Sequence, residues 1–294
     1  MSCWNDFDHP PRPGVRLAER TTWGIGGPAS WYAEPSTVDQ ARRLLARARD
    51  QRMPVYVLGR GSNLLVDDAG VDGLVLRLQG ASLAEIQVDP DAARMTCGAG
   101  ALLAEAVRLA AEHGLANLEA LAGIPGTMGG AVRMNAGDEQ GIGRWVEAVE
   151  TLDLQGRTAR RTRDELKFGY RHSNLDECVV TEVVLALAPE SPESVRERTR
   201  AQLARKQRTQ PLDARSAGCV FRNPPGASAG ALIDAAGCKG WAEGAAVVSE
   251  RHANYILNRG KATAAQVRRL IDRVREAVAR AHGVELELEV TVWP

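Results

Sequence analysis

The chain has 294 residues, and its 37 basic and 37 acidic side chains give a formal net charge of zero at pH 7. This balance excludes the basic surface of a typical nucleic-acid-binding protein and the polybasic patch of a membrane-surface protein. No apolar run is long enough to span a membrane, and residues 1–13 lack the apolar stretch of a signal peptide. We therefore expect a cytoplasmic protein with no nucleic-acid or membrane partner.

The cysteines indicate free thiols. There are five of them, an odd number, and no two form a C-x-x-C pair: Cys3, Cys97, Cys178, Cys219 and Cys238. This pattern argues against a disulfide framework and against a structural zinc site. We expect no metal site, and a reducing compartment fits best.

Apolar periodicity predicts helices and strands in mixed order. In chain order these are a helix at 36–52 capped by Ser36, strands at 55–58 and 74–78, a helix at 101–113 ended by Gly114, strands at 146–154 and 178–187, helices at 192–208 and 263–282, and a strand at 284–293. Helices and strands do not alternate regularly, so the pattern favours an α+β fold over a doubly wound one. The helix at 192–208 is rich in arginine, and two interpretations are open. Composition alone favours a solvated basic face, and the alternative is an edge that binds a diphosphate.

Two glycine-rich segments are candidates for a phosphate-bearing ligand. Residues 58–66 are expected to run strand, glycine loop, strand, which is not the strand-to-helix context of a Rossmann motif. Consecutive N–H groups in such a loop form an anion-binding concavity, to which Ser62 and Asn63 add side-chain donors. In residues 122–131, four glycines let the backbone lie flat against a cofactor, Pro125 stiffens the turn, and Thr127 caps a short helix. Tight turns without a ligand are the alternative for each segment.

Together the two segments resemble the flavin-binding domain of the vanillyl-alcohol-oxidase type. Over nearly the whole chain, the sequence is similar to the UDP-N-acetylenolpyruvoylglucosamine reductase family. The matching pieces, in order, are residues 22–27, 58–66, 121–137, 168–173, 205–211, 216–224, 229–240, 248–258 and 286–290. The resemblance implies two α/β flavin-binding subdomains at 1–78 and 79–208. A C-terminal α+β substrate-binding domain follows at 209–294, and its last strand can return to the flavin site.

The resemblance implies non-covalent FAD, and residues 58–66 hold no histidine for covalent attachment. The FAD contacts that it implies are Gly59, Arg60, Gly61, Ser62, Asn63, Leu64, Ala122, Gly123, Ile124, Pro125, Gly126, Thr127, Gly129, Gly130, Ala131, Asn135 and Gly137. It also implies a two-stage reaction of peptidoglycan precursor synthesis, and hence a role in cell shape and division. NADPH reduces the flavin, and flavin N5 then gives hydride to C3 of the enolpyruvyl ether of UDP-N-acetylglucosamine. A proton reaches C2, and the product is UDP-N-acetylmuramate. We expect a monomer.

Three residues match the family's catalytic positions. Arg171 would hold the carboxylate of the enolate intermediate. Glu289 would assist if protonated or hydrogen-bonded, although only the family's Leu-Glu-x-Glu-Val pattern selects it over Glu285 and Glu287. Cys219 stands at the proton-donor position, where serine is more usual in the family. A thiol is far more acidic than an alcohol, with a usual pKa of about 8.5. Ser216 is a substitute donor, expected on the opposite face of a strand.

Substrate contacts carry over to Tyr170, Arg205, Gln210, Asn223 and Asn254. Residues 172–204 leave no room for the tyrosine-bearing lid loop of one subclass, so the chain resembles the shorter subclass. Residues 138–140 and Thr291 depart from the family pattern, which leaves flavin contacts there open. Two alternatives remain: another flavoprotein oxidoreductase of the same fold, or a non-catalytic homologue that binds FAD or UDP-sugar.

Overall fold

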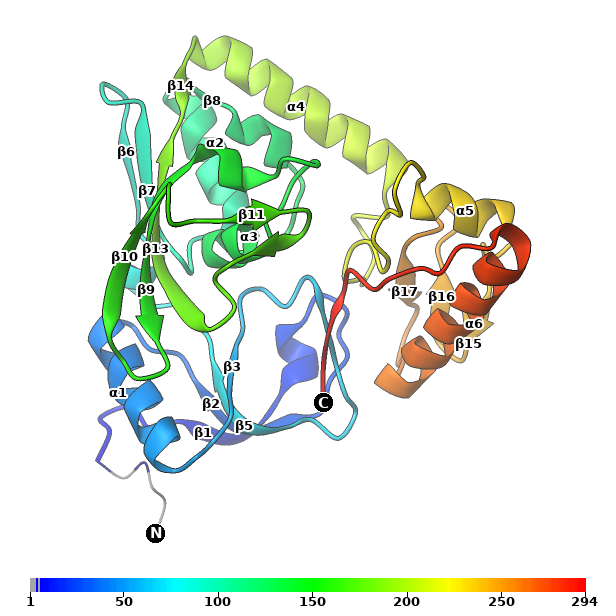
Figure 1. Cartoon of the computed structure of the whole chain (residues 1–294), viewed down its shortest axis with the longest axis horizontal. Helices are drawn as coiled ribbons and strands as arrows, with labels where there is room; N and C mark the ends of the chain where they lie inside the picture. Colours follow the sequence, from blue (N-terminus) through cyan, green and yellow to red (C-terminus); the bar gives the residue numbers. More distant parts are fainter. Residues whose placement is uncertain (1–3, 5) are drawn as a thin grey trace. The chain divides into compact units, whose positions relative to one another are not determined.

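The computed structural model describes residue 4 and residues 6–294 (Figure 1). Cys3 lies outside the described residues. By internal contacts the chain forms two units, each built from several stretches of sequence. Unit 1 comprises Met1–Pro13, Trp31–Arg60 and Asp72–Arg205, and unit 2 comprises Gly14–Ser30, Gly61–Val71 and Lys206–Pro294. This division does not test the predicted domain joins at 78/79 and 208/209, which stay predictions.

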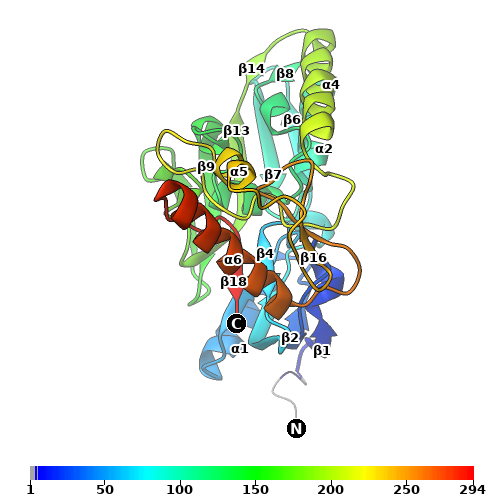
Figure 2. The ribbon, with the colours of Figure 1, turned by 90° about the vertical axis from the view of Figure 1, so that its right-hand side faces the viewer.

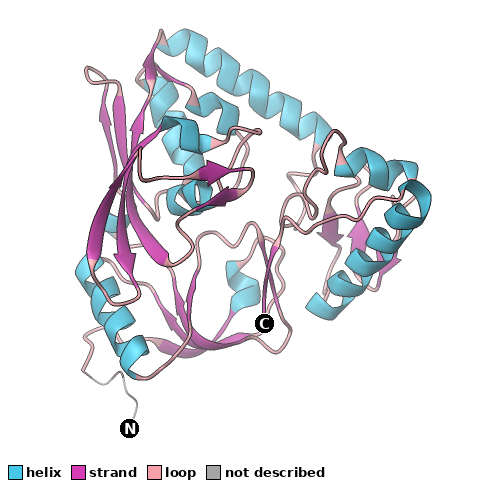
Figure 3. Cartoon of the chain, viewed as in Figure 1, coloured by secondary structure: helices cyan, strands magenta, loops and turns pink. Residues whose placement is uncertain are grey.

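The elements confirm the predicted α+β class (Figure 3). The α-helices are α1 (Val38–Asp50), α2 (Leu103–Glu112), α3 (Met128–Arg133), α4 (Pro192–Thr209), α5 (Ala229–Ala235) and α6 (Ala264–His282). The strands are β1 (Arg12–Arg16), β2 (Pro28–Ala33), β3 (Val55–Val57), β4 (Leu64–Val66), β5 (Val71–Leu76), β6 (Ile86–Asp89), β7 (Arg94–Gly98), β8 (Leu115–Ala116), β9 (Val146–Asp153), β10 (Thr158–Thr162), β11 (Phe168–Gly169), β12 (His172–Ser173), β13 (Cys178–Ala186), β14 (Ala188–Pro189), β15 (Ala242–Glu243), β16 (Ala246–Val248), β17 (Ile256–Asn258) and β18 (Thr291–Trp293). Short 3-10 helices occupy Leu17–Arg20, Ala81–Leu83, Leu118–Leu121 and Ile142–Trp145.

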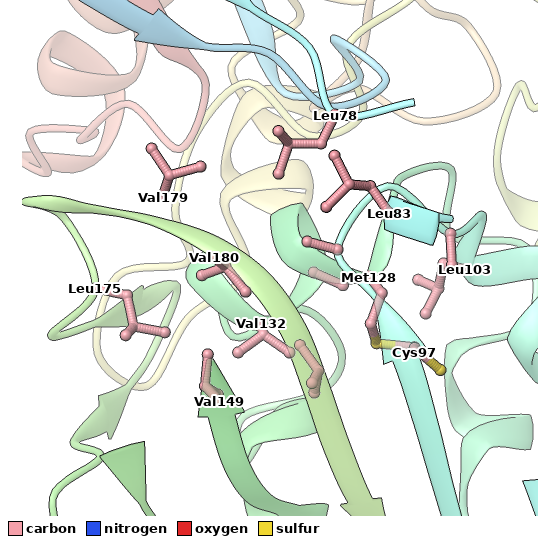
Figure 4. Close-up of a cluster of buried hydrophobic side chains, with 14 of the residues drawn as sticks. Leu78, Leu83, Cys97, Leu103, Met128, Val132, Val149, Leu175, Val179 and Val180 are labelled. Carbon is pink, nitrogen blue, oxygen red and sulfur yellow. The ribbon is translucent and has the colours of Figure 1, made fainter. Parts of the chain in front are cut away.

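An antiparallel sheet of order β10-β9-β13-β7-β6 organises unit 1. Its central strand β13 is buried along almost its whole length, which explains its continuous apolar sequence. The short helix α3 packs on this sheet. Figure 4 shows Met128 and Val132 of α3 among Val149 and Val180 of the sheet, with Cys97 in the same core. The second glycine segment is thereby tied to the unit's main core.

A second sheet has the order β1-β2-β5-β3. Within it β3 pairs in parallel with β5, Val55 opposite Leu74. Buried side chains of α1 and β5 belong to the same core of unit 1. The cap of α1 is Thr37, one residue later than predicted, and the helix begins at Val38. Thr37 accepts a hydrogen bond from the backbone N–H of Gln40, whereas Ser36 bonds to the Gln40 side-chain oxygen. The prediction of Ser36 as the cap was therefore wrong.

Unit 2 has its own core, formed by α5, α6 and the meander β15-β16-β17. Helix α6 contacts β15 and β16 of the meander, and Figure 2 shows it beside β16. The helix confirms the one predicted at 263–282; it begins with a capping box between Thr263 and Gln266 and ends at Gly283 in the left-handed conformation. The predicted strand at 284–293 is largely wrong, because within that range only Thr291–Trp293 forms a strand. Residues before it form a single bridge, Leu288 to Phe221, because their neighbour there is an irregular segment and not a strand.

The last strand returns to the first glycine segment. In unit 2, β18 pairs in parallel with β4, and Thr291 lies opposite Leu64. The backbone N–H of Thr291 also bonds to the Asn63 carbonyl, 3.0 Å away. The chain's end is thus joined to the strand that leaves the glycine loop. Among the described residues, no helix is long and apolar enough to cross a membrane.

Candidate active site

The two glycine segments meet within unit 1 at Gly59 and Thr127. A Cβ added to Gly59 would lie 2.8 Å from Thr127 Oγ1, so no larger residue fits between the segments. Thr127 caps α3 by accepting a bond from the backbone N–H of Gly130, as predicted. Gly129 is equally constrained, since its added Cβ would lie 2.8 Å from Ala99 Cβ. Main-chain groups of the two glycine segments therefore lie close together without intervening side chains, which fits an extended cofactor that contacts the backbone.

Gly61 carries the same segment into unit 2. Its φ of +64° favours glycine, and an added Cβ would lie 2.6 Å from the Arg20 carbonyl oxygen. The backbone of Thr22 holds the loop, its N–H donating to the Gly61 carbonyl at 3.1 Å. The conformation of the glycine loop is therefore set by packing as well as by composition.

Asn135 is buried and uses its amide inside unit 1. Its Oδ1 accepts from the N–H of Gly143 at 2.8 Å, and its Nδ2 donates to the carbonyls of Gln140 and Gly169 at 3.2 and 2.9 Å. These bonds tie the end of the second glycine segment to the hairpin that carries Tyr170 and Arg171. A cofactor contact by Asn135, which stays a prediction, would have to coexist with these three bonds.

Arg171 sits in a strained turn. Strands β11 and β12 pair Gly169 with His172, which leaves Tyr170 and Arg171 as a two-residue connection. The φ of Arg171 is +52°, a region that costs energy for any residue with a side chain. The guanidinium lies over the Tyr170 ring, 4.8 Å from its centroid, and one N–H points to the Asp138 carbonyl at 3.4 Å. The turn therefore presents Tyr170 and Arg171 together.

Asp138, one of the departures from the family pattern, stabilises the neighbouring turn. Its carboxylate accepts bonds from the N–H groups of Gln140 and Gly141 and from Arg144. Partial burial alone would raise the pKa of Asp138, but the bonds from Gly141 and Arg144 outweigh it and hold the pKa below its usual value. The Asp138 side chain thus has a structural role, and the Asp138 backbone carbonyl is the group to which Arg171 points.

Cys219 lies in unit 2 on a segment held from two sides. The N–H of Val220 donates to the Asn254 carbonyl at 2.9 Å, and the Val220 carbonyl accepts from the N–H of Glu289 at 2.8 Å. The preceding residue, Gly218, has a φ of +77°, so the segment is not the strand that we expected around Ser216 and Cys219. The argument that these two residues occupy opposite faces was therefore wrong.

The burial of the thiols separates Cys219 from the other described cysteines. Cys97, Cys178 and Cys238 are buried, and Cys219 is half-buried. Burial raises the pKa of all three buried thiols, that of Cys97 to about 12 with the nearby charge of Glu182 adding to the effect. These three side chains fit a core role. Among the described cysteines, Cys219 alone is partly exposed.

Glu289 is half-buried, whereas Glu285 and Glu287 are exposed. Glu287 turns toward Arg222, at 4.0 Å. The backbone of Glu289 joins two parts of unit 2, because its N–H donates to Val220 and its carbonyl accepts from Asn63 Nδ2 at 3.1 Å. The structure thus brings together Cys219, Glu289 and the Asn63 end of the glycine loop.

The predicted substrate residues differ in environment. Asn254 is 2% exposed, and its amide bonds to both backbone groups of Phe221, at 2.9 and 2.8 Å. Asn223 is exposed and accepts from the N–H of Ala229 at the start of α5. Arg205 is exposed near the end of α4, with its Nε 3.2 Å from the Gln202 side chain, and the Gln210 carbonyl accepts from Arg251. Only Val195 of α4 is buried, which agrees with a solvated basic helix.

Two residues that contact residues 216–219 were not singled out from the sequence. Tyr255 is 6% exposed, and its hydroxyl forms a hydrogen bond with the Cys219 side chain. Thr22 donates from its hydroxyl to the Ser216 carbonyl at 2.7 Å. Both lie in pieces that match the family, but their roles depend on chain segments that only folding brings together. No group of three or more His, Cys, Asp or Glu side chains that could hold a metal occurs in the part of the chain that the structure describes.

Comparisons with known proteins agree with this arrangement. Residues 29–161 match the family profile described as an FAD binding domain, and residues 210–293 match that of the C-terminal domain of UDP-N-acetylenolpyruvoylglucosamine reductase. A UDP-N-acetylenolpyruvoylglucosamine reductase of Moorella thermoacetica is 48% identical over 94% of this chain and 91% of its own length. A second, from Heliobacterium modesticaldum, is 44% identical over 94% and 88%. The crystal structure of the enzyme from Thermus caldophilus covers 97% of this chain and 100% of its own, with 42% identity and a TM-score of 0.83.

The fold and the glycine segments therefore define an FAD-dependent oxidoreductase. The predicted fold class is confirmed, with a flavin-binding domain and a separate C-terminal domain characteristic of the reductase. At this identity and coverage, the chain belongs to the UDP-N-acetylenolpyruvoylglucosamine reductase family.

Proposed function

We propose that the protein reduces the enolpyruvyl ether of UDP-N-acetylglucosamine to UDP-N-acetylmuramate in the cytoplasm, as a monomer, with NADPH as the electron source. Bound FAD would supply the hydride, from its N5 atom to C3 of the enolpyruvyl group. The family membership supports the substrate class. The single observation that carries the proposal is the half-buried Cys219 thiol, held beside Glu289 by the backbone of Val220.

Cys219 donates the proton that C2 needs. Addition of hydride at C3 leaves negative charge spread over C2 and the carboxylate, and an acid within reach completes the reduction. Its partial exposure and its fixed segment support this role, whereas the buried thiols lack access. A thiol is acidic enough to give up its proton to a carbanion and is readily reprotonated at neutral pH.

Arg171 and Glu289 support the negative charge. A guanidinium makes two parallel bonds to a carboxylate, and the strained turn of Arg171 indicates that its direction is fixed by the surrounding structure. Glu289 is the half-buried glutamate of its segment, and it assists the anion in its protonated or hydrogen-bonded form.

The remaining polar residues bind the UDP-sugar. Arg205 meets the diphosphate, while Gln210, Asn223 and Tyr170 contact the rest of the substrate, and Asn254 supports the site through Phe221. Most of residues 172–204 belongs to β12, β13, β14 and the first part of α4, which supports assignment to the subclass without a lid loop. FAD contacts are made by the backbones of the two glycine segments, in which Gly59 and Thr127 lie together.

A redox titration tests this function. The purified holoprotein is expected to show flavin absorbance that bleaches with NADPH under anaerobic conditions and returns on addition of the enolpyruvyl substrate. Mass spectrometry is expected to find the lactyl ether. Bleaching without reoxidation by that substrate would instead favour a non-catalytic homologue, and reoxidation by oxygen alone would favour another flavoprotein oxidoreductase.

A further inference from the structure

Tyr255 has a buried hydroxyl that faces the site. The side chain is 6% exposed, and its hydroxyl bonds to the Cys219 side chain. Its backbone is fixed on both sides, since its N–H donates to the His252 carbonyl at 3.0 Å and its own carbonyl accepts from Ser249 at 2.8 Å. The His252 ring contacts the Tyr255 ring edge-to-face, with centroids 4.9 Å apart. The phenol is therefore held in one orientation.

Hydrogen bonds also join the two segments that carry Tyr255 and Cys219. The residue next to Tyr255, Asn254, receives the N–H of Val220, the residue next to Cys219. Asn254 also binds both backbone groups of Phe221 through its side chain. Three hydrogen bonds thus join the Cys219 segment to the Tyr255 segment, so the contact between thiol and phenol is built into the fold.

The groups around the phenol keep it in its protonated form. Burial, the neighbouring Cys219 and the carboxylate of Glu289 all raise the pKa of Tyr255 far above its usual value, so the hydroxyl keeps its proton and is able to donate a hydrogen bond. His252, the other titratable group in contact with Tyr255, has its pKa lowered by burial and by Lys239. It is therefore neutral at pH 7 and adds no positive charge at the sulfur. The Tyr255 hydroxyl is then a donor that can support a thiolate at Cys219.

We propose that Tyr255 is a positioning residue for proton transfer, whose O–H donates to the Cys219 sulfur, directs the thiol, and stabilises the thiolate left after transfer. This inference rests on the proposed role of Cys219. In the step, the S–H bond breaks and its electron pair stays on sulfur, while the carbanion pair at C2 forms the new C–H bond. A proton from water then restores the thiol. Tyr255 keeps its own proton throughout.

The test compares Tyr255→Phe with a matched control. Tyr32→Phe removes another buried phenol, which donates to Glu34 at 2.6 Å in unit 1. In each FAD-loaded protein, the rate of Cys219 alkylation by iodoacetamide is followed against pH, with peptide mass spectrometry to separate it from the other cysteines. Loss of a hydrogen bond to a charged group is expected to move the midpoint of this profile up by about one to two pH units in Tyr255→Phe. It is expected to stay in place in Tyr32→Phe. An unchanged midpoint in folded Tyr255→Phe overturns the inference.

A second measurement leaves the side chain in the protein. Global replacement of the four tyrosines by 3-fluorotyrosine makes the phenol a stronger donor. The alkylation midpoint of Cys219 is expected to fall, and Tyr255→Phe protein labelled in the same way is expected to show no such fall. A midpoint that does not respond to fluorination contradicts the proposed bond even if Tyr255→Phe fails to fold.

Turnover separates this inference from the proposed function. Tyr255→Phe is expected to lower kcat roughly ten- to a hundredfold with little change in KM, and to have no further effect when Cys219 is alanine. If Cys219→Ala turns over normally, the role of Cys219 fails, while the alkylation profile still reports the hydrogen bond. If Cys219→Ala is impaired but Tyr255→Phe changes neither kcat nor the alkylation midpoint, only the inference about Tyr255 fails.

Discussion

Asn254→Ala tests whether Asn254 contacts substrate directly or holds the Cys219 segment. The side chain is 2% exposed and bonds to the N–H and the carbonyl of Phe221, itself 2% exposed. Alanine leaves both groups buried without these partners, at about 1–3 kcal/mol each, so the free energy of unfolding falls by about 2–6 kcal/mol. For a chain of this size, the thermal midpoint then drops by at least about 4 °C.

The assay is thermal unfolding followed by circular dichroism, together with KM for the enolpyruvyl substrate. Asn223→Ala is the control, because Asn223 is also an asparagine expected to bind substrate but is exposed. It is expected to change the midpoint by no more than about 2 °C while raising KM. An Asn254→Ala protein with an unchanged midpoint and a raised KM would refute the structural role and restore the direct substrate contact.

Three further predictions concern charge, flavin and pH. Arg171→Ala and Glu289→Gln are each expected to lower kcat about a hundredfold or more with flavin content unchanged, and loss of FAD on purification would make them cofactor ligands instead. Gly59→Ala places a Cβ against Thr127 and is expected to weaken FAD retention about tenfold or more; a full flavin-to-protein absorbance ratio after dialysis would contradict this. Burial lowers the pKa of His252, and its Nδ1 accepts a bond from the Asn254 N–H, so the unfolded chain takes up this proton at higher pH than the folded chain. Stability that is present above about pH 6.5 is therefore lost as the pH falls toward the pKa of His252 in the folded state. In His252→Gln, the denaturation midpoint is expected to depend less on pH over that range.

Local sequence signals predicted the parts of the fold whose causes are local. Helix α6 was predictable because its apolar spacing, its Thr263 cap and Gly283 all lie within the helix and its ends. The cap by Thr127 was predictable for the same reason. The starting residue of α1 was missed because Ser36 and Thr37 are both capable caps, and the Gln40 side chain decides between them.

The site was only partly predictable, because its geometry depends on distant pieces of chain. A family pattern pointed to Cys219 and Glu289, but the path of the Cys219 segment is set by Asn254 on one side and Glu289 on the other. The apolar residues of that segment alone predict a strand, but the positive φ of Gly218 is not compatible with one. No role could be assigned to Tyr255 from the sequence, because no feature of the neighbouring residues predicts that its hydroxyl contacts Cys219.

The measurement that bears most directly on the account is the turnover of Cys219→Ala and Cys219→Ser against the unaltered protein, with the enolpyruvyl substrate and NADPH at saturation. The account predicts that the alanine variant keeps its FAD and loses roughly 10² to 10⁴-fold in kcat, the usual contribution of a positioned general acid. The serine variant, which restores the residue more usual in the family, is predicted to keep substantial activity. An alanine variant that turns over like the unaltered protein would contradict the assignment of Cys219 as the proton donor.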